Sequence, residues 1–144
     1  MIRGIGSSGT TILIVEDDEN FRQLLEVFLT LEGDVREVRS AANGYEAIQE
    51  CANFRPDVVL IDLVLPDGSP RDVAIRIRAM HPRASLVTIS GMNMDTSAWA
   101  DHHVSKGAHT LEEIRRLVAR RREIRLGGID LEDRRTRADG PNSR

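Results

Sequence analysis

The sequence has one cysteine, one lysine and no long apolar run. Cys51 has no second cysteine to pair with, so an internal disulfide is excluded, as is usual in a reducing cytoplasm. The longest uninterrupted apolar segments, residues 12–15 and 58–61, fall far short of the roughly 20 residues that span a bilayer. The first eleven residues have one arginine and no sustained apolar segment, so they do not read as a signal peptide. We therefore expect a cytoplasmic protein that does not enter the membrane.

The chain also lacks the concentrated positive charge of a nucleic-acid-binding protein. Residues 1–109 carry 16 acidic and 10 basic side chains, whereas residues 110–126 carry six arginines and three acids. A basic helix on an acidic body predicts a solvated face or a homodimer face, and no direct contact with nucleic acid. Lys106 is the only lysine among 20 basic residues, which draws attention to its position.

Short β-branched segments alternate with amphipathic segments along the chain. Strands are expected at residues 11–15, 35–40, 58–61, 84–89 and 103–105. Helices between them favour an α/β fold with a parallel sheet and helices on both faces, because the crossovers are right-handed. We expect one domain over residues 11–126, a flexible leader at 1–10 and a disordered tail at 127–144.

Two helices begin with capping signals. Ser69 followed by Pro70 predicts a helix that begins at Pro70 and ends near residue 80. Thr110 and Glu113 have the spacing of a capping box, which predicts that Thr110 is the N-cap of a last helix ending near residue 126.

The connection between the fourth and fifth strands is unusually short. Residues 91–100 give about ten positions, whereas a parallel crossover normally needs about a dozen or more. The fourth helix is therefore expected to be short or partly unwound. Met92, Met94 and Trp99 in this segment could cover the core or form a patch for a partner, and core cover is the favoured interpretation.

Polar side chains stand at the carboxyl ends of four predicted strands. These are Glu16, Asp17, Asp62, Ser90 and Lys106. Parallel strands bring such ends to one edge of a sheet. Carboxylate oxygens suit Mg²⁺, and an aspartate beside the ion can attack phosphorus. A lysine and a hydroxyl can then neutralise charge on the phosphoryl oxygens.

Each of these residues alone has an ordinary explanation. Acids after a strand are commonly a solvated helix N-terminus, and a single lysine or serine is commonly exposed without a special role. Asp62 is harder to explain in this way, because it interrupts the apolar run VVLIDLVL, where a carboxylate is costly unless it faces a polar site. The conjunction of these residues at four strand ends favours a shared site.

The motifs TILIVEDDENFRQLL, PDVVLIDLVLPDG, LVTISG and VSK follow one another in this order. With them, the chain resembles the receiver domain of two-component response regulators over residues 11–126. The resemblance implies a flavodoxin-like fold with a five-stranded parallel sheet in the order 2-1-3-4-5, helices on both faces and a shortened fourth helix.

The resemblance also implies roles for the acidic residues. Asp62 corresponds to the phosphoacceptor, and Asp17 corresponds to a direct Mg²⁺ ligand. Glu16 corresponds to a ligand that acts through water, and the backbone carbonyl of Val64 corresponds to a further ligand. Val64 and Met92 are apolar at positions that often set the lifetime of the phosphoryl group, so we expect slow self-dephosphorylation.

Ser90 and Lys106 correspond to the residues that contact the phosphoryl group, and Ser90 with His103 corresponds to the switch. Three residues depart from the family pattern. His103 replaces the usual tyrosine or phenylalanine, Gly107 replaces a proline after the lysine, and Pro70 replaces a glycine. These departures make the lysine loop and the switch the parts where this chain is expected to differ.

The implied function is a signalling switch, stand-alone or excised from a longer regulator. A histidine kinase or a phosphotransfer protein donates the phosphoryl group, and the product changes binding to a downstream protein. Two alternatives remain open: an interaction module that no longer accepts phosphate, and a Mg²⁺-dependent phosphohydrolase. The hydrolase would want an acid/base carboxylate where Val64 stands.

Overall fold

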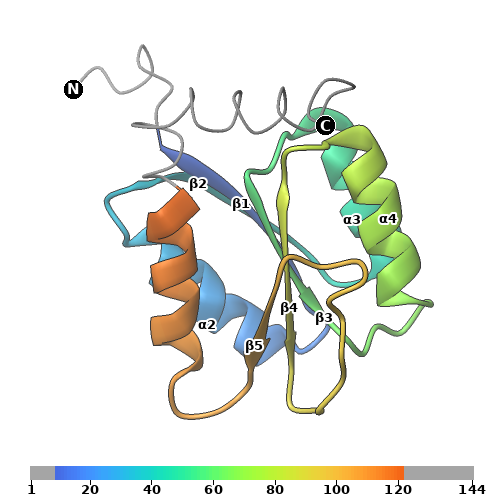
Figure 1. Cartoon of the computed structure of the whole chain (residues 1–144). Coiled ribbons are helices and arrows are strands. Elements are labelled where there is room, and N and C mark those ends of the chain that lie inside the picture. Colours follow the sequence, from blue (N-terminus) through green and yellow to red (C-terminus); the bar gives the residue numbers. More distant parts are fainter. Residues whose placement is uncertain (1–8, 122–144) are drawn as a thin grey trace, which may run out of the picture.

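The computed structural model describes residues 9–121, which form one five-stranded sheet (Figure 1). The strands are β1 (Thr10–Val15), β2 (Val35–Ala41), β3 (Val58–Asp62), β4 (Ser85–Ser90) and β5 (His102–Ser105). All neighbouring strands are parallel and their order is β2-β1-β3-β4-β5, which confirms the predicted topology. β1 and β3 are buried along their whole length, as strands covered on both faces should be.

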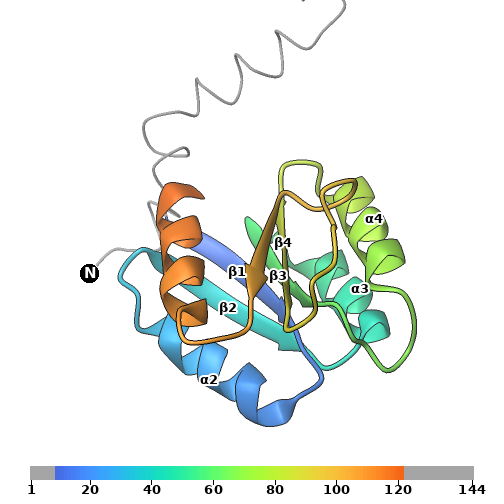
Figure 2. The same ribbon diagram turned by 60° about the horizontal axis from the view of Figure 1, so that its bottom comes forward.

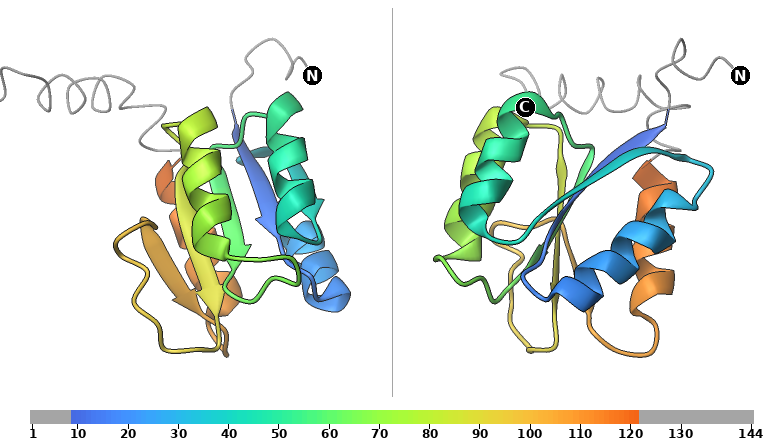
Figure 3. Two further views of the ribbon diagram at one scale, coloured as in Figure 1. Left: turned by 90° about the vertical axis from the view of Figure 1, so that its right-hand side faces the viewer. Right: turned by 180° about the vertical axis from the view of Figure 1, so that it is seen from behind.

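Helices cover both faces of this sheet. They are α2 (Glu19–Thr30), α3 (Gly44–Asn53), α4 (Pro70–Met80) and a last helix that the structure describes over residues 110–121, termed the C-terminal helix. α2 and the C-terminal helix lie on one face, and α3 and α4 lie on the other (Figures 1 and 3). None of the helices within the described residues has the length and apolar character that a membrane span requires.

The alternation of side chains along the strands divides the core into two apolar clusters. In β1, Leu13 packs in the cluster beneath α3 and α4, whereas Ile12 and Ile14 pack in the cluster beneath α2 and the C-terminal helix. Each of these side chains is fully buried, and burial of a side chain of this size contributes roughly 1.5–3 kcal/mol. The two clusters fix the strand ends, and thereby the polar residues that follow them.

The start of α4 confirms the predicted capping signal. Ser69 is the N-cap, its hydroxyl accepts a hydrogen bond from the Asp72 amide at 3.2 Å, and Pro70 is the first helical residue. β1 begins at Thr10, within the predicted leader. The rest of that leader before residue 9, and the predicted tail at 127–144, lie outside the described residues.

The predicted capping box of the C-terminal helix is wrong. Thr110 lies inside the helix, and the Glu113 amide donates to the carbonyl of His109 at 3.0 Å. The Thr110 hydroxyl oxygen instead accepts from the Gly107 amide at 2.6 Å and lies 2.8 Å from the Ser105 carbonyl. The hydroxyl therefore closes the loop that follows β5, which competes with the capping role that its spacing suggested.

The crossover between β4 and β5 has shortened to a loop with one turn at residues 97–99 (Figure 2). The Trp99 amide donates to the Thr96 carbonyl at 3.0 Å, and no further helical turn follows before β5. Trp99 packs against the cluster beneath α3 and α4, whereas Met92 and Met94 are exposed. Core cover is therefore correct for the tryptophan and wrong for the methionines.

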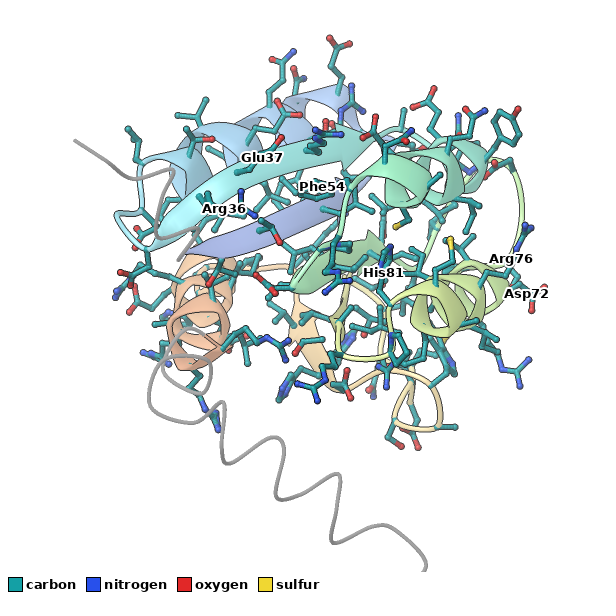
Figure 4. All side chains as sticks on the ribbon, turned by 90° about the horizontal axis from the view of Figure 1, so that it is seen from above. Arg36, Glu37, Phe54, Asp72, Arg76 and His81 are labelled. Atoms are coloured by element: carbon teal, nitrogen blue, oxygen red, sulfur yellow. The ribbon has the colours of Figure 1, made fainter. Side chains whose placement is uncertain are left out.

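A hydrogen bond connects α3 with the residue after α4, at the end of each helix that lies away from the carboxyl ends of the strands. His81, which follows α4 and is labelled in Figure 4, has its Nε2 2.8 Å from the carbonyl oxygen of Cys51 in α3. Asp72 and Arg76 lie on the outer side of α4, away from the sheet (Figure 4). The inner side of the helix, with Ala74 and Ile77, is fully buried.

Candidate functional site

The carboxyl ends of β1, β3, β4 and β5 meet at one edge of the sheet (Figure 1). β3 ends at Asp62 and β4 ends at Ser90, while Glu16 directly follows β1 and Lys106 directly follows β5. The register of the sheet sets Asp62 beside Ile89, so the acceptor candidate and Ser90 lie on adjacent strands. The structure thus gathers residues that are up to 90 positions apart in sequence.

Three carboxylates form an acidic cluster at this edge. One oxygen each of Glu16, Asp17 and Asp62 lies within 4.8 Å of the other two. Glu16 is 2% exposed and Asp62 is 6% exposed, whereas Asp17 is exposed. Burying two carboxylates side by side is costly without a compensating cation. The chain accepts this cost at one place among the described residues, which marks the cluster as a functional site.

Lys106 supplies part of the compensating charge. Its Nζ lies 3.3 Å from Glu16 Oε1 and 3.6 Å from Asp62 Oδ2, so one ammonium bridges both buried acids. The Lys106 amide also donates to the Ser90 carbonyl at 2.9 Å, which ties the start of the lysine loop to the end of β4. The face of the Phe21 ring, 4.8 Å from Nζ, adds a cation–π contact.

Within the acidic cluster, the pKa of the Glu16 carboxyl is shifted well above its ordinary value. Burial, together with the neighbouring Asp62, raises the pKa of this carboxyl from 4.5 to about 7. A hydrogen bond from the Asp18 amide, 3.1 Å from Oε2, and the ammonium of Lys106 act in the opposite direction. A divalent cation among these carboxylates would favour the charged form of Glu16.

Asp62 and the segment after it are held by a local hydrogen bond. The Val64 amide donates to Asp62 Oδ1 at 3.3 Å, which leaves Oδ2 on the side of Lys106. The Val64 side chain is exposed, so it does not interpose an apolar group between the carboxylates. Val64 therefore lies next to the cluster, where the sequence predicted it.

The side chains of the two predicted switch residues bond to groups outside the acidic cluster. Ser90 is buried, and its hydroxyl oxygen accepts a hydrogen bond from the Met92 amide at 2.8 Å. His103 Nδ1 lies 2.7 Å from the hydroxyl of Thr88, which in turn is 3.0 Å from the hydroxyl of Thr96. These contacts join β4 and β5 to Thr96 of the shortened crossover, and no pattern in the sequence predicted them.

Two contacts of the site were missed from the sequence. Phe21 of α2 packs against the apolar core, and its ring also faces Lys106. Arg22 donates from Nη1 to the Glu16 carbonyl at 2.9 Å and so fixes the backbone of the loop after β1. Their place in the first turns of α2 was the available signal, because the start of that helix adjoins the acidic cluster.

The donor set fits Mg²⁺. Mg²⁺ is bound by hard oxygen ligands, commonly one or two carboxylates with water and substrate oxygens. Glu16, Asp17 and Asp62 offer such oxygens, and the exposed Asp17 leaves the cluster open to solvent on one side. Neither sulfur nor imidazole is among the residues of this cluster.

The family comparison identifies the domain. The family described as the response regulator receiver domain matches residues 12–117. The chain is a receiver domain. The predicted resemblance is thereby confirmed as family membership.

The chain is similar in sequence to several curated proteins, including a response regulator and a chemotaxis protein. The response regulator protein PilR of Pseudomonas aeruginosa is 37% identical over 89 residues, which is 61% of this chain and 20% of PilR. The chemotaxis protein CheY of Thermotoga maritima is 30% identical over 84 residues, 58% of this chain and 69% of CheY. The chain spans about half, or less, of the length of the first curated relatives that it matches.

Solved structures agree with the fold. The response regulator protein TrrA of Thermotoga maritima, solved in complex with Mg²⁺–BeF, is 31% identical and superposes with a TM-score of 0.68 over 78% of this chain and 98% of that chain. The receiver domain of the sensor histidine kinase PA1611 of Pseudomonas aeruginosa, with Mg²⁺ in its active-site cleft, is 24% identical and gives a TM-score of 0.69 over 80% of this chain and 98% of that chain.

Proposed function

We propose that this receiver accepts a phosphoryl group on Asp62 with Mg²⁺ held by Glu16, Asp17, Asp62 and the Val64 carbonyl. The observation that carries the proposal is the bridge of Lys106 Nζ between the two buried acids, 3.3 Å from Glu16 and 3.6 Å from Asp62. An ammonium at this place suits a group that brings further negative charge to Asp62. The Mg²⁺–BeF complex of TrrA supports the proposal by likeness.

The chemistry follows from the surroundings of Asp62. A carboxylate oxygen of Asp62 attacks phosphorus, the bond from phosphorus to the donor breaks, and the donor leaves with the electron pair. Glu16, Asp17 and Asp62 would hold Mg²⁺, which would supply positive charge against the carboxylates and the phosphoryl oxygens. Lys106 stabilises the same oxygens, and the Val64 amide holds the orientation of the Asp62 carboxylate.

Phosphorylation would change the protein by shifting the equilibrium between two conformations of the residues at the carboxyl ends of β3, β4 and β5. The Ser90 hydroxyl, which now accepts from the Met92 amide, is the nearby hydroxyl that can turn to donate to a phosphoryl oxygen on Asp62. Such a change frees the amide at the start of the β4–β5 crossover and alters the exposed surface around Met92 and Met94. A downstream protein would recognise that surface, and His103 is the ring placed to respond with it.

A protein phosphodonor needs a surface that places it over Asp62. α2 begins two residues after Asp17, and the helix with its C-cap exposes an apolar stripe: Leu24 is 48%, Val27 is 60% and the C-cap Leu31 is 78% exposed. Residues three, four and seven positions apart lie on one side of a helix. This stripe is the docking surface that we propose for a histidine kinase or a phosphotransfer protein.

The test is incubation of the full chain with Mg²⁺ and acetyl phosphate, followed by intact-mass measurement. A gain of one phosphoryl group that is absent in Asp62→Asn, and absent when the metal is chelated, is the expected result. No modification of the wild type would indicate an interaction module that does not take phosphate. Multiple turnover of a phosphoester would indicate a hydrolase.

A further inference from the structure

The segment from the end of β2 to the first turn of α3 contacts both loops that carry the acidic cluster. The Glu16 amide donates to the carbonyl of Ala41, the last residue of β2, at 3.0 Å. From the other side, the carboxylate of Asp67, in the loop between β3 and α4, accepts from the amides of Gly44 and Tyr45, each at 2.8 Å. The segment from Ala41 to Tyr45 thereby connects the loop of Glu16 with the loop that follows the phosphoacceptor.

Asp67 completes the capping of α3. The first four amides of a helix have no partner within it. In α3 the third and fourth amides bond to Asn43, through its side chain at 2.8 Å and its carbonyl at 3.1 Å. The first two bond to Asp67, which lies 22 residues beyond Tyr45. These two bonds lower the pKa of the Asp67 carboxyl, so it is charged at neutral pH.

The contact needs glycine at position 44. A Cβ built on Gly44 would lie 2.7 Å from Val73 Cγ2 and 3.3 Å from Asp67 Oδ1. Val73 belongs to α4, so any larger residue would require the Val73 side chain and the Asp67 carboxylate to shift away from position 44. The close approach of the α3 backbone and the carboxylate therefore depends both on glycine at position 44 and on Asp67.

The loop between Asp62 and Asp67 is held at each end. The Val64 amide bonds to Asp62, and Leu65 pairs with Gly68 in an isolated bridge in which Gly68 has a φ of 139°. That φ is readily adopted only by glycine. The Val64 carbonyl, a proposed metal ligand, thus stands between one anchor at the phosphoacceptor and another at α3.

We infer that Asp67 is a positioning residue, which ties the loop after Asp62 to α3 and so holds Val64 and Asp62 opposite Glu16. The inference rests on the proposed function, because its effect is expressed through Mg²⁺ binding. Loss of an outer partner of a metal ligand typically weakens metal binding by about 10–100-fold. For Asp67, which acts through a loop of several residues, we expect the lower end of this range.

The experiment compares the full-length wild type with Asp67→Ala and Asp67→Asn. Phosphoryl uptake from acetyl phosphate is measured as a function of Mg²⁺ concentration, beside direct Mg²⁺ titration by calorimetry. In Asp67→Ala the half-saturating Mg²⁺ concentration should rise roughly tenfold, while the rate at saturating Mg²⁺ stays within about twofold. Asp67→Asn keeps one acceptor oxygen, so its half-saturating Mg²⁺ concentration should lie between those of the wild type and Asp67→Ala.

Asp95 offers a matched control. Its carboxylate also accepts from a backbone amide, that of Ser97 at 2.9 Å, which lowers its pKa, but the contact is local. Asp95→Ala should leave the Mg²⁺ dependence unchanged. Hydrogen exchange of the Gly44 and Tyr45 amides supplies a separate readout, because these amides should lose protection in Asp67→Ala and keep it in Asp95→Ala.

The outcomes separate the inference from the proposed function. A wild type that neither binds Mg²⁺ nor takes up phosphate overturns both. A wild type that does both, with an unchanged Mg²⁺ dependence in Asp67→Ala, overturns only the role of Asp67, as does an equal shift in Asp95→Ala. If Asp67→Ala does not fold, Asp67→Asn decides by the same titration against Asp95→Asn.

Discussion

Replacing Glu16 by glutamine tests the electrostatics of the site directly. In the metal-free fold the pKa of Glu16 is about 7, above its ordinary value of 4.5. A raised pKa means that folding favours the protonated acid. The contribution of protonated Glu16 to the free energy of unfolding is therefore fully present below about pH 4.5, and it is lost as the pH rises through 7. Glutamine keeps the shape of the protonated acid and removes this dependence.

The size of the effect follows from the pKa difference. A shift of one pKa unit corresponds to about 1.4 kcal/mol, so ionised Glu16 costs the metal-free fold about 3 kcal/mol above pH 7. For a domain of this length, 1 kcal/mol moves the melting temperature by roughly 3–5 °C. Glu16→Gln should thus melt roughly 10 °C above the metal-free wild type at pH 8, and only slightly above it at pH 5.

The assay is thermal unfolding of both proteins from pH 5 to 8, with and without Mg²⁺. Mg²⁺ should raise the melting temperature of the wild type at pH 8 more than at pH 5, because at pH 5 it competes with a proton on Glu16. Glu113→Gln, at an exposed glutamate, is the matched control and should follow the wild type at every pH. A gap between wild type and Glu16→Gln that is constant with pH would refute the reasoning.

Three further substitutions test the proposed roles of single side chains. Lys106→Met should slow phosphoryl uptake from acetyl phosphate by roughly 100-fold, since it removes the ammonium that bridges Glu16 and Asp62; an unchanged rate by intact mass would contradict its role. Val64→Glu should shorten the lifetime of the phosphorylated protein, up to roughly 100-fold, because a carboxylate can orient attacking water; equal half-lives after removal of the donor would count against slow self-dephosphorylation. Val27→Asp should weaken transfer from a cognate kinase at least tenfold and leave uptake from acetyl phosphate intact; parallel losses with both donors would show damage to the site instead of to docking.

Much of the site could be predicted because its residues are marked by local conflict. Asp62 interrupts an apolar strand, and such a residue must face a polar site wherever the strand is buried. Once the alternation of strands and helices gives a parallel sheet, the residues after each strand share one edge without further assumptions. Glu16 and Lys106 follow from that topology and from their position in the chain.

The errors arise where a local signal has two possible partners. Thr110 has the spacing of a capping box, but its hydroxyl can equally bond to the loop before the helix, and only the folded chain decides between them. Asp67 stands in a Pro-Asp-Gly segment with the composition of a turn, and the amides that it bonds are 22 and 23 residues away. Contacts of this kind depend on how α3 and α4 pack, which periodicity along the chain does not encode.

His103 shows how a substitution at a recognisable position changes the physics of that position. The resemblance places His103 in the switch, and the structure ties its exposed ring to a buried hydroxyl by a 2.7 Å contact between Nδ1 and Thr88. Thr88 has one proton to donate and also contacts Thr96 and the carbonyl of residue 102, so it keeps partners if the ring leaves. Outward rotation of His103 therefore costs one hydrogen bond, about 1 kcal/mol, and leaves the Thr88 hydroxyl with a partner. For an apolar ring at this position, rotation would change only van der Waals contacts. The rotation of His103 also changes a hydrogen bond to Thr88, and Thr88 contacts Thr96 in the crossover that begins after Ser90.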